Sequence, residues 1–183
     1  ANADVGGNPF SVVVSGKYAY VANSGENTMS VVDISNPHSP VQVNTVTVGS
    51  VPYTVFVSGN RAYTSNYNEN SLSIIDITDP TTPVWLASTT VGTGPDYIYV
   101  AGRYAYVTNE GNTLAIVDIS SSTKPVLVSS STIGNAPVGV FVAGRYAYMA
   151  NSGNASISVV DISGTEVTSL LAHSAEIGAL QVR

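Results

Sequence analysis

A six-residue pattern occurs four times in this chain and constrains its fold more than any other feature. The segments 18–23, 61–66, 104–109 and 146–151 read YAYVAN, RAYTSN, YAYVTN and YAYMAN, so the closing Asn recurs after 43, 43 and 42 residues. A second pattern keeps the same period, because the segments 31–35, 74–78, 116–120 and 159–163 read VVDIS, IIDIT, IVDIS and VVDIS. Self-similarity at a fixed period of about 40–45 residues is typical of repeat architectures.

Each repeat predicts four short strands. In the first repeat, the apolar runs 9–14, 18–22, 29–34 and 41–48 are separated by Gly, Asn and Pro turns, and none has the 3.6-residue period of a helix. A four-stranded antiparallel sheet repeated at this spacing is the blade of a β-propeller. We therefore expect an all-β propeller as one domain over 1–183, with blades at about 7–48, 49–91, 92–133 and 134–174. The tail 175–183 predicts a spare strand that opens a fifth blade, and a short helix over 170–180 is the alternative.

At these residues the chain resembles the bacterial and archaeal β-propeller repeats that are named after the motifs YVTN and LVIVD. Residues 106–109 match the first motif literally, and residues 114–118, LAIVD, approach the second. The resemblance covers about residues 7–182. It implies a propeller from a secreted or surface-layer protein, or a domain of a cofactor-carrying oxidoreductase whose cofactor ligands lie outside the repeat motif.

The number of repeats departs from this family, whose members commonly close with six to eight blades. Three explanations remain open: a fragment of a longer propeller, a half-propeller that closes an eight-bladed ring with a second copy, and a chain that closes alone with four blades. We favour a half-propeller that associates, since open ends would leave apolar blade faces in contact with water.

Composition excludes several classes of function. Only 10% of the residues are charged and the net charge is −6, which disfavours binding to nucleic acid or to anionic lipid. No apolar run approaches the ~20 residues of a membrane span. The chain has no Cys, so disulfides, thiolate nucleophiles and cysteine metal sites are absent.

The turns separate two faces of the expected disc. The first turns carry four of the six cations, namely Lys17, Arg61, Arg103 and Arg145. The second turns carry the carboxylates and amides of Glu26, Glu69, Glu110, Asn23, Asn66, Asn109 and Asn151. Tyr53 and Tyr97 follow or nearly follow the Pro of a blade connection, so we expect them at the channel mouth on the acidic face.

Each of these sets has a structural interpretation and a functional one. The cationic face is either a repeated solvated charge or an anion site. The acidic face is either a set of polar loop tips or a site for calcium or a sugar, since hard cations bind carboxylate and carbonyl oxygens. The repeated Asp33, Asp76, Asp118 and Asp161 are expected to accept backbone N–H bonds in the turn that follows each of them.

No catalytic or metal site is indicated by the sequence. The two histidines, His38 and His173, neither recur nor show metal-ligand spacing, and no phosphate-binding loop or nucleophile elbow is present. We therefore expect a non-enzymatic module without a cofactor that binds a protein or glycan through its acidic face and forms a homodimer. An extracellular or cell-surface location is expected, with the periplasm as the alternative. An accessory propeller of a cofactor-dependent oxidoreductase is the second hypothesis.

Overall fold

The computed structural model describes residues 1–163 as fifteen antiparallel strands in four sheets. The first sheet holds β1 (Pro9–Ser15), β2 (Tyr18–Asn23), β3 (Thr28–Asp33) and β4 (Val41–Thr47). The second holds β5 (Pro52–Ser58), β6 (Arg61–Asn66), β7 (Ser71–Asp76) and β8 (Val84–Thr90). The third holds β9 (Pro95–Ala101), β10 (Tyr104–Asn109), β11 (Thr113–Asp118) and β12 (Val126–Thr132). The fourth holds β13 (Pro137–Ala143), β14 (Tyr146–Asn151) and β15 (Ser156–Asp161).

Within each sheet the strands follow one another in chain order, as a meander. The first turn is tight, and its Gly has a positive φ in all four sheets, for example 59° at Gly16 and 58° at Gly102, a conformation that L residues rarely adopt. After the third strand, the repeated Asp accepts the backbone N–H two residues ahead, as from Ser35 to Asp33 at 2.8 Å. The expected role of these four aspartates is therefore confirmed.

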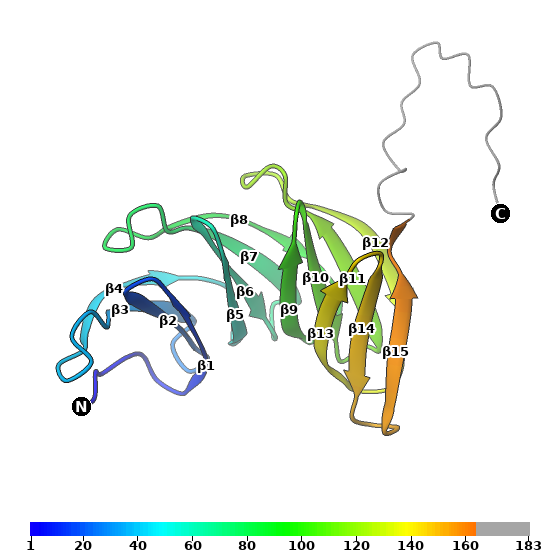
Figure 1. The fold of residues 1–183 in the computed structure, drawn as a ribbon, viewed down its shortest axis with the longest axis horizontal. Coiled ribbons are helices and arrows are strands. Elements are labelled where there is room, and N and C mark those ends of the chain that lie inside the picture. Colours follow the sequence, from blue (N-terminus) through cyan, green and yellow to red (C-terminus); the bar gives the residue numbers. More distant parts are fainter. Residues whose placement is uncertain (164–183) are drawn as a thin grey trace, which may run out of the picture.

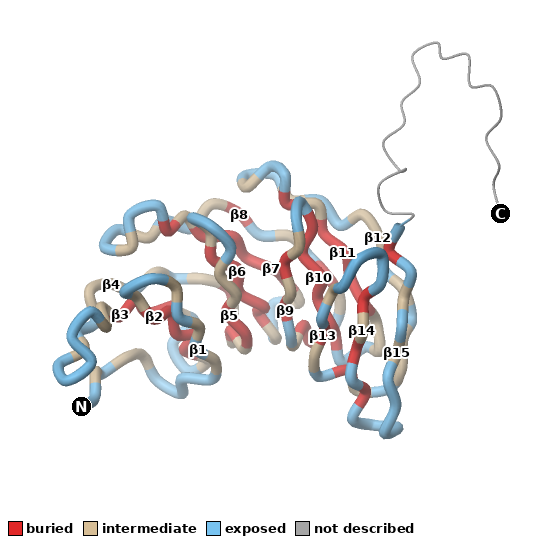
Figure 2. Tube along the Cα trace, in the orientation of Figure 1, coloured by how far each residue is buried: buried red, intermediate tan, exposed pale blue. Residues whose placement is uncertain are grey.

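The sheets are arranged as successive blades along an arc (Figure 1), with the first strands β1, β5, β9 and β13 in contact from one blade to the next. Three apolar clusters fill the spaces between neighbouring blades. The cluster between the second and third blades is built around Leu72, Ile74 and Ile98, all fully buried. Burial is concentrated in the middle blades and decreases towards the end that carries β15 (Figure 2).

The predicted all-β propeller fold is confirmed, and within residues 1–163 the arc does not close on itself. The four sheets fall within the four predicted blade ranges. The fourth strand of the last blade, the spare strand at 175–183 and the alternative helix at 170–180 lie outside the described residues. Over residues 1–163 no helix is long and apolar enough to cross a membrane.

Candidate functional site

A stack of aromatic rings and two carboxylates come together on the face of the second turns. The rings of Phe10 and Tyr53 are parallel with centroids 4.3 Å apart, and the ring of Tyr53 stacks on that of Tyr67 at 4.5 Å. The Tyr67 hydroxyl donates a hydrogen bond to Glu110 Oε2. Asp96 is half-buried and interacts electrostatically with Glu110. We call these five residues the tyrosine–carboxylate cluster.

Two repeat positions build this cluster. The first position directly follows the Pro that begins the first strand of a blade, and it is occupied by Phe10, Tyr53 and Asp96. The second position directly follows the repeated Asn that ends the second strand, and it is occupied by Tyr67 and Glu110. In the first and fourth blades the second position is Ser, at 24 and 152. The cluster therefore exists where the second and third blades depart from the repeat.

A glycine allows the cluster to close. Gly94 has a φ of +60°, and a Cβ atom there would lie 3.1 Å from both Tyr67 Cε2 and Glu110 Cβ. Its carbonyl oxygen accepts the backbone N–H of Glu110 at 2.9 Å. The close approach of the blade connection to the second turn thus places the carboxylate against the phenol.

The cluster changes the protonation of its own groups. The hydrogen bond to Glu110 stabilises the phenol and raises the pKa of Tyr67 to about 12. Partial burial, with the charge of Glu110 as a smaller cause, raises the pKa of Asp96 above its ordinary value of 3.8. The site therefore holds two carboxyl groups, of which Asp96 ionises at a higher pH than usual. Such a pair can form hydrogen bonds with a polar ligand or take part in acid–base chemistry.

The three predicted glutamates do not share one position. Glu26 and Glu69 follow the turn's Asn by three residues, whereas Glu110 follows its Asn directly. Glu69 Oε2 accepts the backbone N–H of Ser50 at 3.1 Å, and Glu26 lies against Gly7. Of the three, only Glu110 reaches the aromatic stack.

The four predicted asparagines are buried inside the second turns rather than displayed to a ligand. Asn66 Nδ2 donates to Ser71 Oγ and Ser73 Oγ, both at 2.9 Å. Asn23, Asn109 and Asn151 bind hydroxyls of the following strand in the same way. We leave these asparagines out of the proposed site because their amides hold the turn.

The two predicted tyrosines lie in different places. Tyr53 is the central ring of the tyrosine–carboxylate cluster. Tyr97 lies instead beside Phe141, Tyr148 and Ile157, where it lines a shallow hollow of about 390 Å³ on the last blade.

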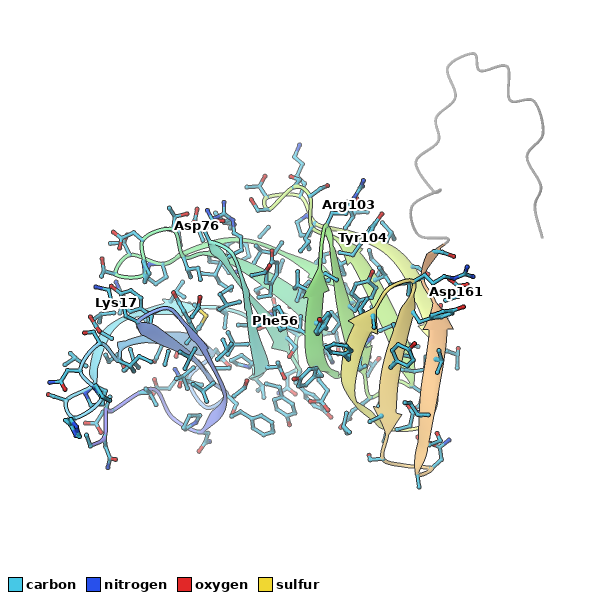
Figure 3. All side chains as sticks on the ribbon, in the orientation of Figure 1. Lys17, Phe56, Asp76, Arg103, Tyr104 and Asp161 are labelled. Carbon is cyan, nitrogen blue, oxygen red and sulfur yellow. The ribbon has the colours of Figure 1, made fainter. Side chains whose placement is uncertain are left out.

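The predicted cations lie on the face of the first turns, and in Figure 3 Lys17 and Arg103 lie with Asp76 and Asp161 along one edge of the arc. Arg61 Nη1 contacts Asp76 Oδ1 at 2.8 Å, and Arg103 and Arg145 form ion pairs with Asp118 and Asp161. Each arginine is thus neutralised by the Asp of its own blade. No group of three or more potential metal ligands comes together within residues 1–163.

Phe10, Tyr67 and Asp96 were not predicted from the sequence. A signal was present, because the interval from the turn's Asn to the Asp of the third strand is ten residues in three copies and nine in the third. That deletion removes the position of Glu26 and Glu69 from the third copy, and Glu110 stands at the position of Tyr67. The residues directly after the Pro and directly after the repeated Asn also differ from copy to copy.

The model of the LVIVD repeat matches this chain four times, at residues 6–48, 53–91, 96–132 and 134–168. The chain belongs to the LVIVD repeat family. The predicted resemblance is therefore confirmed on its LVIVD side, and the matched repeats contain all of the described strands except the first residue of β5 and of β9. No curated protein sequence matches this LVIVD repeat protein.

Solved structures share the fold at low sequence identity. A protein of Bacteroides uniformis named as a 6-phosphogluconolactonase has a TM-score of 0.76 and 19% identity, over 84% of this chain and 50% of that one. The periplasmic gluconolactonase PpgL of Pseudomonas aeruginosa has a TM-score of 0.75 and 20% identity, over 84% and 49%. The computationally designed protein Ika4 has a TM-score of 0.70 and 10% identity, over 85% and 92%. The LVIVD repeat protein spans about half the length of the two natural proteins.

The expectation that this chain has no enzymatic activity is corrected by these comparisons. It rested on the absence of familiar catalytic motifs, but two proteins with this fold are named as lactonases. A propeller builds a site from single residues of several blades, so a missing linear motif does not exclude catalysis. At 19–20% identity the likeness itself shows the fold.

Proposed function

We propose that this LVIVD repeat protein is a binding propeller that takes a neutral, carbohydrate-type ligand at the tyrosine–carboxylate cluster, as part of a secreted or cell-surface protein. The observation that carries the proposal is the break in the repeat. Tyr67, Asp96 and Glu110 differ from the residues at the same positions of the outer blades, and they converge on one place.

The chemistry of the cluster suits a ligand that has both apolar and hydroxyl-bearing surfaces. Phe10 is 60% exposed although it stacks on Tyr53, so an apolar ring face remains available to a ligand. The C–H face of a sugar ring can pack on such rings, whose bodies are apolar while the tyrosine hydroxyl offers a polar group. The carboxylates of Asp96 and Glu110 accept hydrogen bonds from hydroxyls.

Charge narrows the ligand class. The described cations of the first turns lie on the opposite face, and the arginines among them are ion-paired. A phosphorylated or uronic sugar would meet Asp96 and Glu110 with no cation of residues 1–163 on this face to balance its charge. The proposed ligand is therefore uncharged.

The test is calorimetric titration with a panel of neutral oligosaccharides. Tyr53→Ala and Glu110→Gln are each expected to weaken binding at least tenfold, because one removes the central ring and the other a charged hydrogen-bond acceptor. Glu26→Gln is the matched control, since it changes a carboxylate of the same face outside the cluster. Equal affinities in all three variants, or binding of a protein ligand alone, would refute the carbohydrate site.

Hydrolysis of a neutral sugar lactone is the second candidate, and the pair of Asp96 and Glu110 favours it. A carboxylate at Glu110 can accept a proton from the water that attacks the lactone carbonyl. Asp96, which keeps its proton to a higher pH than an ordinary aspartate, can donate a proton to the ring oxygen as the C–O bond breaks, and the product is the hydroxy acid. The names of two proteins with the same fold support this reaction class.

A pH-stat assay separates the two candidates. If the site is hydrolytic, unphosphorylated gluconolactone is expected to open faster than in buffer alone, and faster than its 6-phosphate. Glu110→Gln should then lower the rate about 10²-fold or more. A rate equal to that of buffer removes the lactonase candidate and leaves the binding proposal in place.

A further inference from the structure

Both ends of the arc expose apolar side chains. At the first blade, Val12 and Val14 of β1 are 63% and 59% exposed. At the last blade, Phe141, Ile157 and Val159 are 57%, 67% and 55% exposed. We call these two sets the leading face and the trailing face.

The repeat shows what each face packs against when it lies inside the arc. Val12 and Val14 occupy the positions of Ile98 and Val100 in the third blade, where both are buried against the second blade. The internal copy of the leading face is therefore covered by the blade that precedes it.

The trailing face has an internal copy as well. Phe141, Ile157 and Val159 occupy the positions of Phe56, Leu72 and Ile74 in the second blade. Leu72 and Ile74 are fully buried, and Phe56 packs on the same cluster, against the third blade. The leading and trailing faces are thus copies of two surfaces that fit each other within this molecule.

The trailing face also has a shape that suits this contact. Its hollow of about 390 Å³ is lined by Tyr97, Phe141, Tyr148 and Ile157. Gly139, at the inner strand, has no atom within 4 Å of the place a Cβ would occupy. An aliphatic side chain from a following blade can enter here, as Ile98 does between the second and third blades.

We propose that a second copy of this chain covers both faces, with the leading face of each copy on the trailing face of the other. The two contacts are identical and related by a two-fold axis, so the association closes after two copies into a ring of eight blades. The partner is a second copy rather than an unrelated protein because the complementary surface is already present at the opposite end of the chain. This inference does not depend on the proposed ligand.

The mass of the 183-residue chain in solution tests the proposal. Sedimentation equilibrium is expected to give twice the chain mass of 18.9 kDa at micromolar concentration. Val14→Asp and Phe141→Asp should each weaken the dimer at least 100-fold, because each one places a charge in both contacts. Val41→Asp is the control, since Val41 is 55% exposed on the outermost strand β4, away from both faces.

Mixing the two variants shows whether the leading face of one copy binds the trailing face of the other or each face binds its own kind. Combining the Val14→Asp and Phe141→Asp variants leaves one intact contact, formed by the unchanged trailing face of the first and the unchanged leading face of the second. The mixture should therefore dimerise more strongly than either variant alone. Circular dichroism of each variant shows whether it is folded.

Two results would overturn the proposal. One is a wild-type chain that sediments as a monomer at micromolar concentration. The other is a pair of folded variants whose mixture associates no better than its components, which would show that leading and trailing faces do not meet.

Discussion

The buried asparagine at the end of each second strand makes full use of its amide in only one blade. Asn66 Oδ1 accepts the Gly49 N–H at 3.2 Å and the Thr64 hydroxyl at 3.1 Å. The Oδ1 atoms of the other three asparagines receive no hydrogen bond from the described residues. The missing hydroxyl bond follows from the second strand, because the position of Thr64 is Val or Met in the other blades.

Val107→Thr should therefore stabilise the protein. The new hydroxyl lies where Thr64 lies relative to Asn66 and can donate to Asn109 Oδ1, which is expected to add about 0.5–1.5 kcal/mol to the free energy of unfolding. Urea denaturation measures this change. Val117→Thr, also fully buried but without an unpartnered acceptor beside it, should lose about 1–3 kcal/mol. Equal losses in both variants would contradict this account.

The Tyr67 phenol should titrate above the ordinary pKa of a tyrosine. Its hydrogen bond to Glu110 holds the phenolic proton and gives it a pKa of about 12. Glu110→Gln removes the charged acceptor, so the pKa should fall towards the ordinary value of 10. NMR of the tyrosine ζ carbons as a function of pH measures both values, and Glu26→Gln should leave them unchanged. A Tyr67 pKa that does not respond to Glu110→Gln would refute the contact.

At the scale of the element, the second turn joins each blade to the next. Asn27, Asn70 and Asn112 all have a positive φ, and each side-chain Oδ1 accepts a backbone N–H from the next blade connection, at 2.8 to 3.0 Å. The fourth copy has Ala155 in this position, with a φ of 49°. It keeps the left-handed conformation but has no amide to form the connection.

Asn70→Ala and Asn70→Gly separate the two roles of this residue. Asn70→Gly loses only the hydrogen bond to Gly94, which is expected to cost about 0.5–1.5 kcal/mol. Asn70→Ala keeps a Cβ in the left-handed region but also loses the polar side chain with which Asn tolerates that conformation, so it is expected to be less stable than Asn70→Gly by about 1–2 kcal/mol. Ala155→Gly should instead increase stability, because residue 155 has a left-handed backbone conformation and no side-chain hydrogen bond that the substitution could remove. Thermal denaturation of the three variants ranks them.

The turn after each third strand makes the fold sensitive to acid. Hydrogen bonding from Arg103 holds the pKa of Asp118 at about 2, and Arg145 does the same for Asp161. A carboxyl group whose pKa is depressed in the folded state contributes stability above its unfolded value, and this is lost as pH falls. We therefore expect the melting temperature to fall as the pH is lowered from about 4 to about 2.

Asp118→Asn tests the origin of this acid sensitivity. The variant should melt lower than the wild type at pH 5, and the difference should shrink at pH 2, where about half of the wild-type Asp118 carboxyl groups are protonated. Asp96 acts in the opposite direction, because its raised pKa lowers stability as it ionises. A constant difference between pH 5 and pH 2 would assign the acid sensitivity to other groups.

At the scale of the whole molecule, the period of the sequence was enough to predict the fold. Apolar runs and turn residues determine the strands locally, and their repetition at about 43 residues determines the sheets. The site was harder to predict, because it joins Tyr67 to Glu110 across two blades and depends on positions at which the middle blades differ from the outer ones. The pairing of Arg103 with Asp118 also required the register of β10 on β11, which places Tyr104, the neighbour of Arg103 in the chain, opposite Asp118.

The proposed ring makes stability depend on concentration. Because association favours the folded chain, the melting temperature should rise as the protein is concentrated from about 1 to 100 μM. Differential scanning calorimetry over that range measures the rise, and the Phe141→Asp variant should lack it. A wild-type melting temperature independent of concentration would argue against coupling between folding and association.

Because of Ala155, the two contacts between chains in such a ring would be weaker than the contacts between blades of one chain. Every junction between blades within a chain has an asparagine amide that grips the backbone of its neighbour, whereas the junction between chains would have only a methyl group facing the connection that contains Asn8. A ring built this way would come apart at the same two opposite places and leave each half folded. Subunits could then exchange between rings without unfolding. A subunit with a damaged ligand site could thus be replaced, and the intact site of its partner would be kept.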